Sequence, residues 1–174
     1  MALTDLAGRT TQSKLNSMSV DLIDVTLTTT IATHADGRVI SQSIEIPNAV
    51  AVKGGSAIIQ SIYLQNKDDS VESPALELIF AAENTAITSD ISDAIEIVDA
   101  DLVTAVFQGG VTVSNWSTLK PTSSEFALKT NIGLVVRAES DSRSIFVHTI
   151  NRSGGDYTPS GTGKLSARIG IVKD

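Results

Sequence analysis

The sequence predicts an all-β fold: a single-domain β-sandwich or jelly roll with one or two short helical turns and an extended N-terminal arm. Three observations support this prediction. Short apolar segments alternate with polar residues at a period of two, Gly- and Asp-containing turns separate them, and aromatic residues are only 4% of a chain rich in Val, Ile and Thr. The 174 residues fit one domain. We expect the arm to cover residues 1–19 and the β domain residues 20–174.

The first two predicted strands lie on either side of a tight turn. Residues 22–28 form the first strand, with Val25 and Leu27 on one face and Asp or Thr on the other. Asp36-Gly37 favours a tight turn. The second strand, residues 39–46, follows it.

A Gly-Gly turn at residues 54 and 55 precedes the third predicted strand, residues 57–64. Ile58, Ile62 and Leu64 occupy even positions, so the alternation predicts that they share one face. Ile59 and Tyr63 are then expected on the opposite face.

Residues 88–107 are the segment where a helix competes with a strand, because Asp93 and Glu96 have the spacing of a capping box. Strands are expected on both sides of this segment. With those already described they make eight or nine, the others being residues 76–80, 111–113, 132–138, 144–150 and 163–172.

Charge and composition exclude several classes of function. The net charge is −7 and the 13 Lys and Arg are scattered, so nucleic acid is not an expected partner. The absence of cysteine removes disulfides, thiolate zinc sites and a cysteine nucleophile. No segment reaches the roughly 18 apolar residues of a membrane span, and Met1–Asp5 does not resemble a secretory signal.

Candidate catalytic motifs fail at defined positions. Gly163-Lys164 resembles the end of a phosphate-binding loop, but Leu165 replaces the required Ser or Thr. Gly54-Gly55-Ser56 resembles a nucleophile elbow without its closing glycine. Neither histidine is a good candidate for a catalytic base. His34 adjoins a turn, and His148 alternates with Phe146 and Ile150, which predicts a semi-buried or interface position.

The densest acidic cluster is better explained by capping of helical turns than by calcium binding, because its spacing does not follow an EF-hand loop. It consists of Asp90, Asp93, Glu96, Asp99 and Asp101. The sequence therefore predicts a protein that is not an enzyme and that uses no cofactor and no metal.

Binding is the remaining function, and two features indicate where it occurs. The N-terminal arm combines apolar and cationic residues whose spacing does not suit an amphipathic helix, so we expect it to bind a partner. These residues are Leu3, Leu6, Arg9, Lys14 and Leu15. Ile58-Ile59 and Val135-Val136 place apolar side chains on both faces of their strands, which predicts a homo-oligomer, and we expect a trimer.

Three segments resemble a family of small virion proteins of tailed bacteriophages. The first is Asn48–Leu64, which contains the Gly-Gly-Ser turn and Gln60 and leads to Lys67-Asp68. The others are Asp99–Leu102 and Lys164–Asp174. Residues 1–19 do not match the family pattern.

The resemblance implies a capsid decoration (cement) protein that binds the major capsid protein or other virion proteins. It also implies that the chain is made in the host cytoplasm and resides in the virion. One alternative is another virion component, such as a tail, head-fibre or host-contact protein. A carbohydrate-binding module is a further alternative, although the shortage of aromatic residues counts against it.

Overall fold

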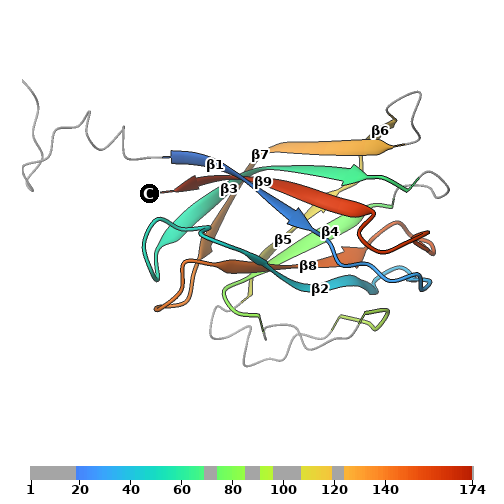
Figure 1. Cartoon of the computed structure of the whole chain (residues 1–174), viewed down its shortest axis with the longest axis horizontal. Helices are drawn as coiled ribbons and strands as arrows, with labels where there is room; N and C mark the ends of the chain where they lie inside the picture. Colours follow the sequence, from blue (N-terminus) through green and yellow to red (C-terminus); the bar gives the residue numbers. More distant parts are fainter. Residues whose placement is uncertain (1–18, 69–73, 85–90, 96–106, 119–123, 174) are drawn as a thin grey trace, which may run out of the picture.

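The computed structural model describes residues 19–68, 74–84, 91–95, 107–118 and 124–173, which form nine antiparallel strands in two sheets (Figure 1). The five-stranded sheet has the order β1 (Ser19–Thr26), β9 (Leu165–Lys173), β3 (Ser56–Asn66), β7 (Glu125–Arg137), β6 (Trp116–Thr118). The four-stranded sheet has the order β2 (Val39–Ile46), β8 (Ile145–Asn151), β4 (Leu76–Ala81), β5 (Phe107–Val113).

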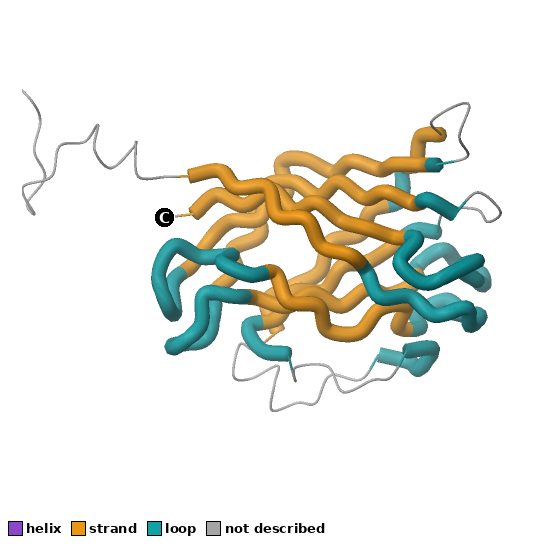
Figure 2. Tube along the Cα trace, viewed as in Figure 1, coloured by secondary structure: helices purple, strands orange, loops and turns teal. Residues whose placement is uncertain are grey.

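The strand order is that of a jelly roll. The chain crosses from one sheet to the other between β1 and β2, β2 and β3, β3 and β4, β5 and β6, β7 and β8, and β8 and β9. The two sheets form the two layers seen in Figure 2. This arrangement joins two Greek keys and confirms the predicted all-β sandwich.

The predicted helical turns lie mostly outside the described residues. The part of this segment that is described, residues 91–95, contains a turn and an isolated bridge between Ala94 and Arg38. The described ranges contain no helix.

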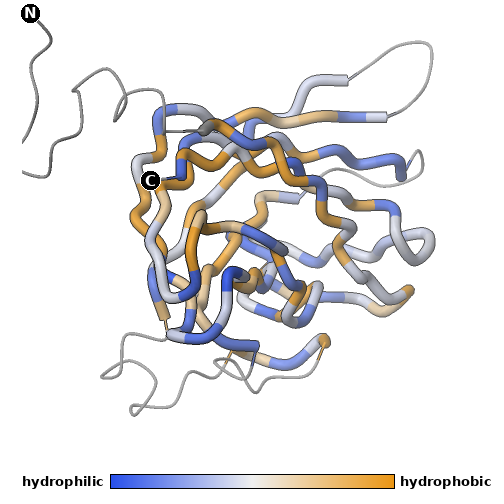
Figure 3. Tube along the Cα trace, turned by 60° about the vertical axis from the view of Figure 1, so that its left-hand side comes forward, coloured by the Kyte–Doolittle hydropathy of each residue, from blue (hydrophilic) through white to orange (hydrophobic). Residues whose placement is uncertain are grey.

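The core fills the space between the two layers. Apolar residues recur along the strands of both sheets (Figure 3), and the inward-facing ones form one continuous buried cluster. Val25 and Leu27 belong to it, as the alternation predicts. Its largest fully buried members include Leu27, Ile40, Ile46, Ile59, Ile62, Leu64, Leu76, Leu78 and Phe80. Full burial of an aliphatic side chain of this size contributes roughly 1.5–3 kcal/mol, so the core compensates for the few aromatic residues.

A bulge in β3 corrects one prediction. Ile59 and Ser61 pair with the consecutive residues Ile171 and Gly170 of β9, which leaves the exposed Gln60 as an extra residue against that strand. The register with β7 shifts at the same place, where residues 131–133 of β7 stand opposite Gln60. Because one extra residue inverts the facing of everything beyond it, Ile59 is fully buried with Ile62, whereas Ile58 lies on the outer face. The predicted even-position face was therefore wrong for Ile58 and Ile59.

Polar side chains connect the two sheets along one side of the sandwich. The Gln108 amide of β5 donates a hydrogen bond to the Arg137 carbonyl oxygen (2.5 Å) and accepts one from the Arg137 N–H (3.0 Å), as a neighbouring strand would. Further along, the Lys129 Nζ donates to the Thr112 carbonyl oxygen at 2.9 Å. The edge strand β5 is thus tied to β7.

We expect Gln108→Ala to lower the free energy of unfolding by about 1–2 kcal/mol, because two partly exposed hydrogen bonds are lost. Urea denaturation would measure this change. Gln108→Glu is the matched variant: it keeps the acceptor for the Arg137 N–H but directs a carboxylate at the Arg137 carbonyl, so it should be at least as destabilising. Wild-type stability in both variants would contradict a role for this bridge.

Candidate interaction surface

The outer face of the five-stranded sheet carries a row of aliphatic side chains. Val20 is paired with Val172, Val172 with Ile58, and Ile58 with Val135, so the row crosses β1, β9, β3 and β7 without a gap. Directly opposite residues in antiparallel strands have Cβ atoms about 4.5–5.5 Å apart, so the four side chains are successive neighbours. We call this set, together with Leu22 next to it on β1, the aliphatic row.

The aliphatic row is exposed at both ends. Val20 is 69% exposed, Leu22 64% and Val135 61%, while Ile58 and Val172 are half-buried. Leu128, also on this face, is 56% exposed. Among the described residues, four of the six exposed large hydrophobic side chains therefore lie on one sheet face. Scattered apolar residues on a surface are ordinary, but a gathering of this kind marks an interaction site.

The remainder of this face is mixed in character. Tyr63 and Phe126 stack with ring centroids 5.8 Å apart, and Tyr63 is also paired with Leu128. Asp24 and Arg168 form an ion pair at 2.6 Å, and the hydrogen bond from the guanidinium holds the pKa of the Asp24 carboxyl below its usual value. The face thus combines apolar area with one neutralised charge pair, a composition that suits protein contacts.

The outer face of the four-stranded sheet differs because the chain itself covers it. Ile79, Ala81 and Ile150 are buried there, with Ile95 and Phe107 packed against them. Since this sheet has its cover, the aliphatic row is the large apolar surface left open by the described residues.

His148 lies on that covered face and is not a catalytic base. It is paired with Ile79, is 1% exposed, and neither ring nitrogen has a hydrogen-bond partner among the described residues. Burial lowers the pKa of His148 to about 4, so the ring is neutral near pH 7. The sequence predicted a semi-buried or interface position, whereas the structure buries His148 fully.

His34 is also enclosed. Its Nδ1 lies 3.1 Å from the Val39 carbonyl oxygen and 3.2 Å from the Ser92 hydroxyl, and burial lowers its pKa. Both contacts brace the connection between β1 and β2.

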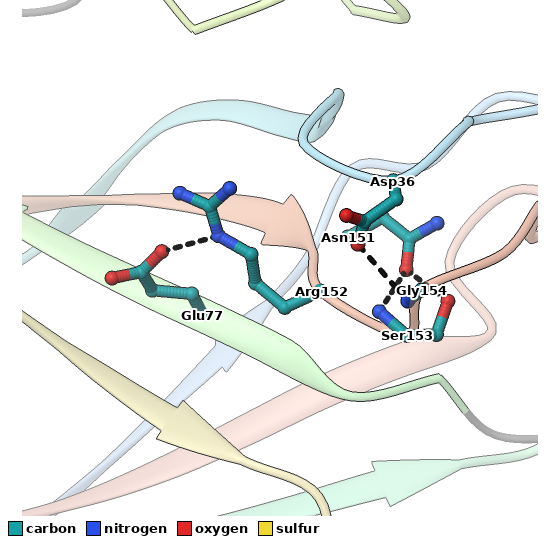
Figure 4. Close-up of polar contacts among 6 residues, drawn as sticks. All are labelled: Asp36, Glu77, Asn151, Arg152, Ser153 and Gly154. Atoms are coloured by element: carbon teal, nitrogen blue, oxygen red, sulfur yellow. Dashed lines mark hydrogen bonds and ion pairs between the residues drawn. The ribbon is translucent and has the colours of Figure 1, made fainter.

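The loop between β8 and β9 is held in place by hydrogen bonds and an ion pair, and we call it the braced loop. The Asn151 amide nitrogen donates to the carbonyl oxygens of His34 (2.7 Å) and Gly155 (2.8 Å). The Asn151 amide oxygen accepts from the Ser153 N–H, the Gly154 N–H donates to Asp36, and Arg152 pairs with Glu77 at 2.7 Å (Figure 4). Residues 152–156 are nevertheless exposed, so this loop presents a fixed backbone to its surroundings.

A groove of about 430 Å³ opens beside the end of β7, lined by Phe107, Gln108 and residues 135–140. At its rim the Glu139 carboxyl is hydrogen-bonded to Glu83, which raises the pKa of Glu139. Two carboxyls in direct contact leave no room for the substrate that a glycosidase pair holds between them. The described residues contain no group of three or more His, Cys, Asp or Glu arranged to hold a metal.

The predicted site residues stand as follows. Leu3, Leu6, Arg9, Lys14 and Leu15 lie outside the described residues, as do all members of the acidic cluster except Asp93. Gly163 has a φ of +68° and leads directly into β9, which confirms a turn and strand in place of a phosphate loop. Ser56 begins β3, so the Gly-Gly-Ser segment enters a strand and forms no strand-to-helix elbow.

The sequence identified Ile58 and Val135 as members of an apolar surface but missed Val20, Leu22 and Val172. The alternation of Val20 and Leu22 with Asp21 was an available signal. Only the register of β1 with β9 shows that Val172 lies beside them.

Comparison with known proteins is limited to structure. No protein-family model matches the chain, and no curated protein matches it. Similar solved structures include a chain from Mud crab tombus-like virus, with 12% identity and a TM-score of 0.32, covering 90% of this chain and 80% of that one. A chain from Desmodium yellow mottle tymovirus gives 9% identity and a TM-score of 0.28, covering 90% of this chain and 87% of that one. A semi-empty virus-like particle of Macrobrachium rosenbergii nodavirus gives 10% identity and a TM-score of 0.28, covering 90% of this chain and 94% of that one.

These TM-scores are below 0.5, so the jelly-roll assignment rests on the strand order itself. Within the described ranges, no helix is long and apolar enough to cross a membrane.

Proposed function

We propose that this chain is a structural protein of a tailed-bacteriophage virion, and that it decorates the capsid by binding the major capsid protein. The observation that carries the proposal is the aliphatic row, an open apolar surface on the five-stranded sheet. The outer face of the four-stranded sheet, in contrast, is covered. The sequence resemblance supplies the class of particle, and the jelly roll is a fold that viral capsid domains use. Fold alone does not assign a function, so the surface is the part to test.

Binding would act through mass action. A protein that binds only the assembled shell stabilises it by RT ln(1 + [L]/Kd) for each site. The contribution is repeated over many copies, so no catalytic group is required. The residues of the N-terminal arm, with Arg9 and Lys14 in a chain of net charge −7, are proposed to extend the same contact.

Self-association is the second way to cover the surface. The trimer that the sequence suggests needs a heterologous contact, in which two different patches meet and the ring closes at three chains. A two-fold contact instead joins identical patches. Sedimentation equilibrium separates these arrangements, since the monomer mass is 18.3 kDa.

A second candidate is a head-fibre, tail or host-contact protein of the same virion. The braced, exposed loop at residues 152–156 favours it, because fixed loops on a rigid scaffold are common recognition sites. Copy number in purified particles distinguishes the two: a decoration protein is present in hundreds of copies, and a tail fitting in few.

We expect Val135→Asp to weaken binding to shells by roughly 30-fold, because a charge buried in an apolar contact costs about 2 kcal/mol. Thr112→Asp on the outer face of the other sheet is the matched control and should bind as wild type. The measurement is occupancy of shells lacking this protein, titrated and separated by sedimentation. Val135 and Thr112 are both exposed, so both variants should fold. Equal affinity of Val135→Asp and wild type would remove the aliphatic row from the contact.

A further inference from the structure

The edge strand β1 is long and regular. All eight of its residues pair with β9 in consecutive register, with no bulge. β1 ends the five-stranded sheet, so on its other side alternate N–H and C=O groups point outward. One side of β1 is occupied by the ladder to β9. Within the described ranges, no backbone hydrogen bond reaches the other side.

The other three sheet edges are protected in ways that β1 is not. β6 has only three residues. β2 carries two register shifts against β8, and β5 is tied to β7 by Gln108 and Lys129. Short strands, bulges and covering groups are the usual means of preventing strand addition. An edge without them is a template for another strand.

The side chains of β1 favour addition of a strand. Val20 and Leu22 are the exposed end of the aliphatic row, so a neighbouring strand would bury them on the outer face. The two acidic residues of β1 would ordinarily oppose such pairing. Each has its own cation on β9, however: Lys173 pairs with Asp21, and Arg168 pairs with Asp24.

We propose that β1 pairs antiparallel with β1 of a second copy of this chain across a two-fold axis. The two five-stranded sheets then form one continuous ten-stranded sheet. This inference rests on the proposed structural role for the supply of many copies, but the contact itself needs no shell. A second copy is the favoured occupant because both copies present the same self-complementary features: an open edge, two exposed aliphatic side chains, and carboxylates already paired with cations.

This pairing changes the expected assembly. The aliphatic row of one copy continues into Val20 and Leu22 of the other, so the apolar surface spans both subunits. An isologous contact closes at two chains. A dimer therefore replaces the trimer as the expected unit in solution.

The first test is the mass in solution. Wild type should sediment at twice 18.3 kDa at tens of micromolar, and Leu22→Lys at 18.3 kDa, because an edge lysine blocks strand addition. Leu128→Lys is the matched control: it places the same charge on the same sheet face, but on β7, and should remain dimeric. A wild-type monomer, or equal dissociation of the two variants, would overturn the proposal.

The second test uses the absence of cysteine in the chain. Leu22→Cys should be joined into a two-chain species by a short bis-maleimide, whereas Leu128→Cys should not. A three-chain mass without cross-linking at position 22 would assign self-association to another surface. Both assays are carried out without shells, so failure of shell binding with an intact dimer would reject only the proposed function.

Discussion

A chain that lacks residues 2–18 is expected to fold as the same jelly roll and to lose most of its binding to shells. Folding should survive because β1 begins at Ser19 and all nine strands remain. Binding should fall because the deletion removes Leu3, Leu6, Leu15, Arg9 and Lys14 together. The sequence predicts that this arm buries its leucines against a partner's surface and that its cations meet acidic groups there.

The design separates loss of binding from loss of fold. Truncated and full-length chains are mixed with particles lacking this protein, and occupancy after sedimentation is compared. Far-UV circular dichroism and the urea midpoint should agree between the two chains. Two further variants divide the effect: one replaces the three leucines with serine, and the other replaces Arg9 and Lys14 with glutamine. Equal occupancy of truncated and full-length chains would show that the β domain alone makes the contact.

Local signals in the sequence predicted the parts of the fold that depend on neighbouring residues. The alternation around Val25 and Leu27 was confirmed because β1 is regular and only one of its faces meets the core. The turns at Gly37 and Gly54 were confirmed because both positions adopt positive φ, +78° and +67°, which glycine allows.

Predictions failed where a strand departs from simple alternation. The sequence around Gln60 gives no local sign that β3 holds an extra residue, since apolar side chains stand on both sides of it. The bulge is fixed by pairing with β9, whose residues lie about 110 positions further along. Ile58 and Ile59 therefore exchange faces for a reason that only tertiary pairing supplies.

The aliphatic row illustrates the same limit for the candidate site. Val20 and Val172 lie at opposite ends of the chain and become neighbours only through the register of β1 with β9. Sequence reasoning could find that the strands of Ile58 and Val135 carry apolar side chains on both faces, but it placed Ile58 on the wrong face. It could not find that these strands are adjacent and that their outward residues form one line.

Acidification is expected to destabilise the protein between pH 6.5 and 4 through His148. Burial lowers the pKa of this ring to about 4 in the folded chain, against about 6.5 when it is unfolded. Between these values the unfolded chain binds a proton that the folded chain excludes. Stability from this group is therefore complete above pH 6.5 and is lost as the pH falls toward 4. The expected loss at pH 4.5 is about 2–3 kcal/mol.

The variant His148→Leu should remove this loss, because leucine has a similar volume and no proton to bind. Its neighbours Ile79 and Ile150 are apolar, and neither ring nitrogen is hydrogen-bonded among the described residues, so the variant should be at least as stable as wild type at pH 7.5. Urea denaturation at pH 7.5, 5.5 and 4.5 gives the difference between the two chains. Burial also lowers the pKa of His34, and its contribution stays in both curves and cancels in the difference. A difference that is constant from pH 7.5 to 4.5 would mean that His148 titrates alike in both states, and that the covered face opens to water more readily than its packing indicates.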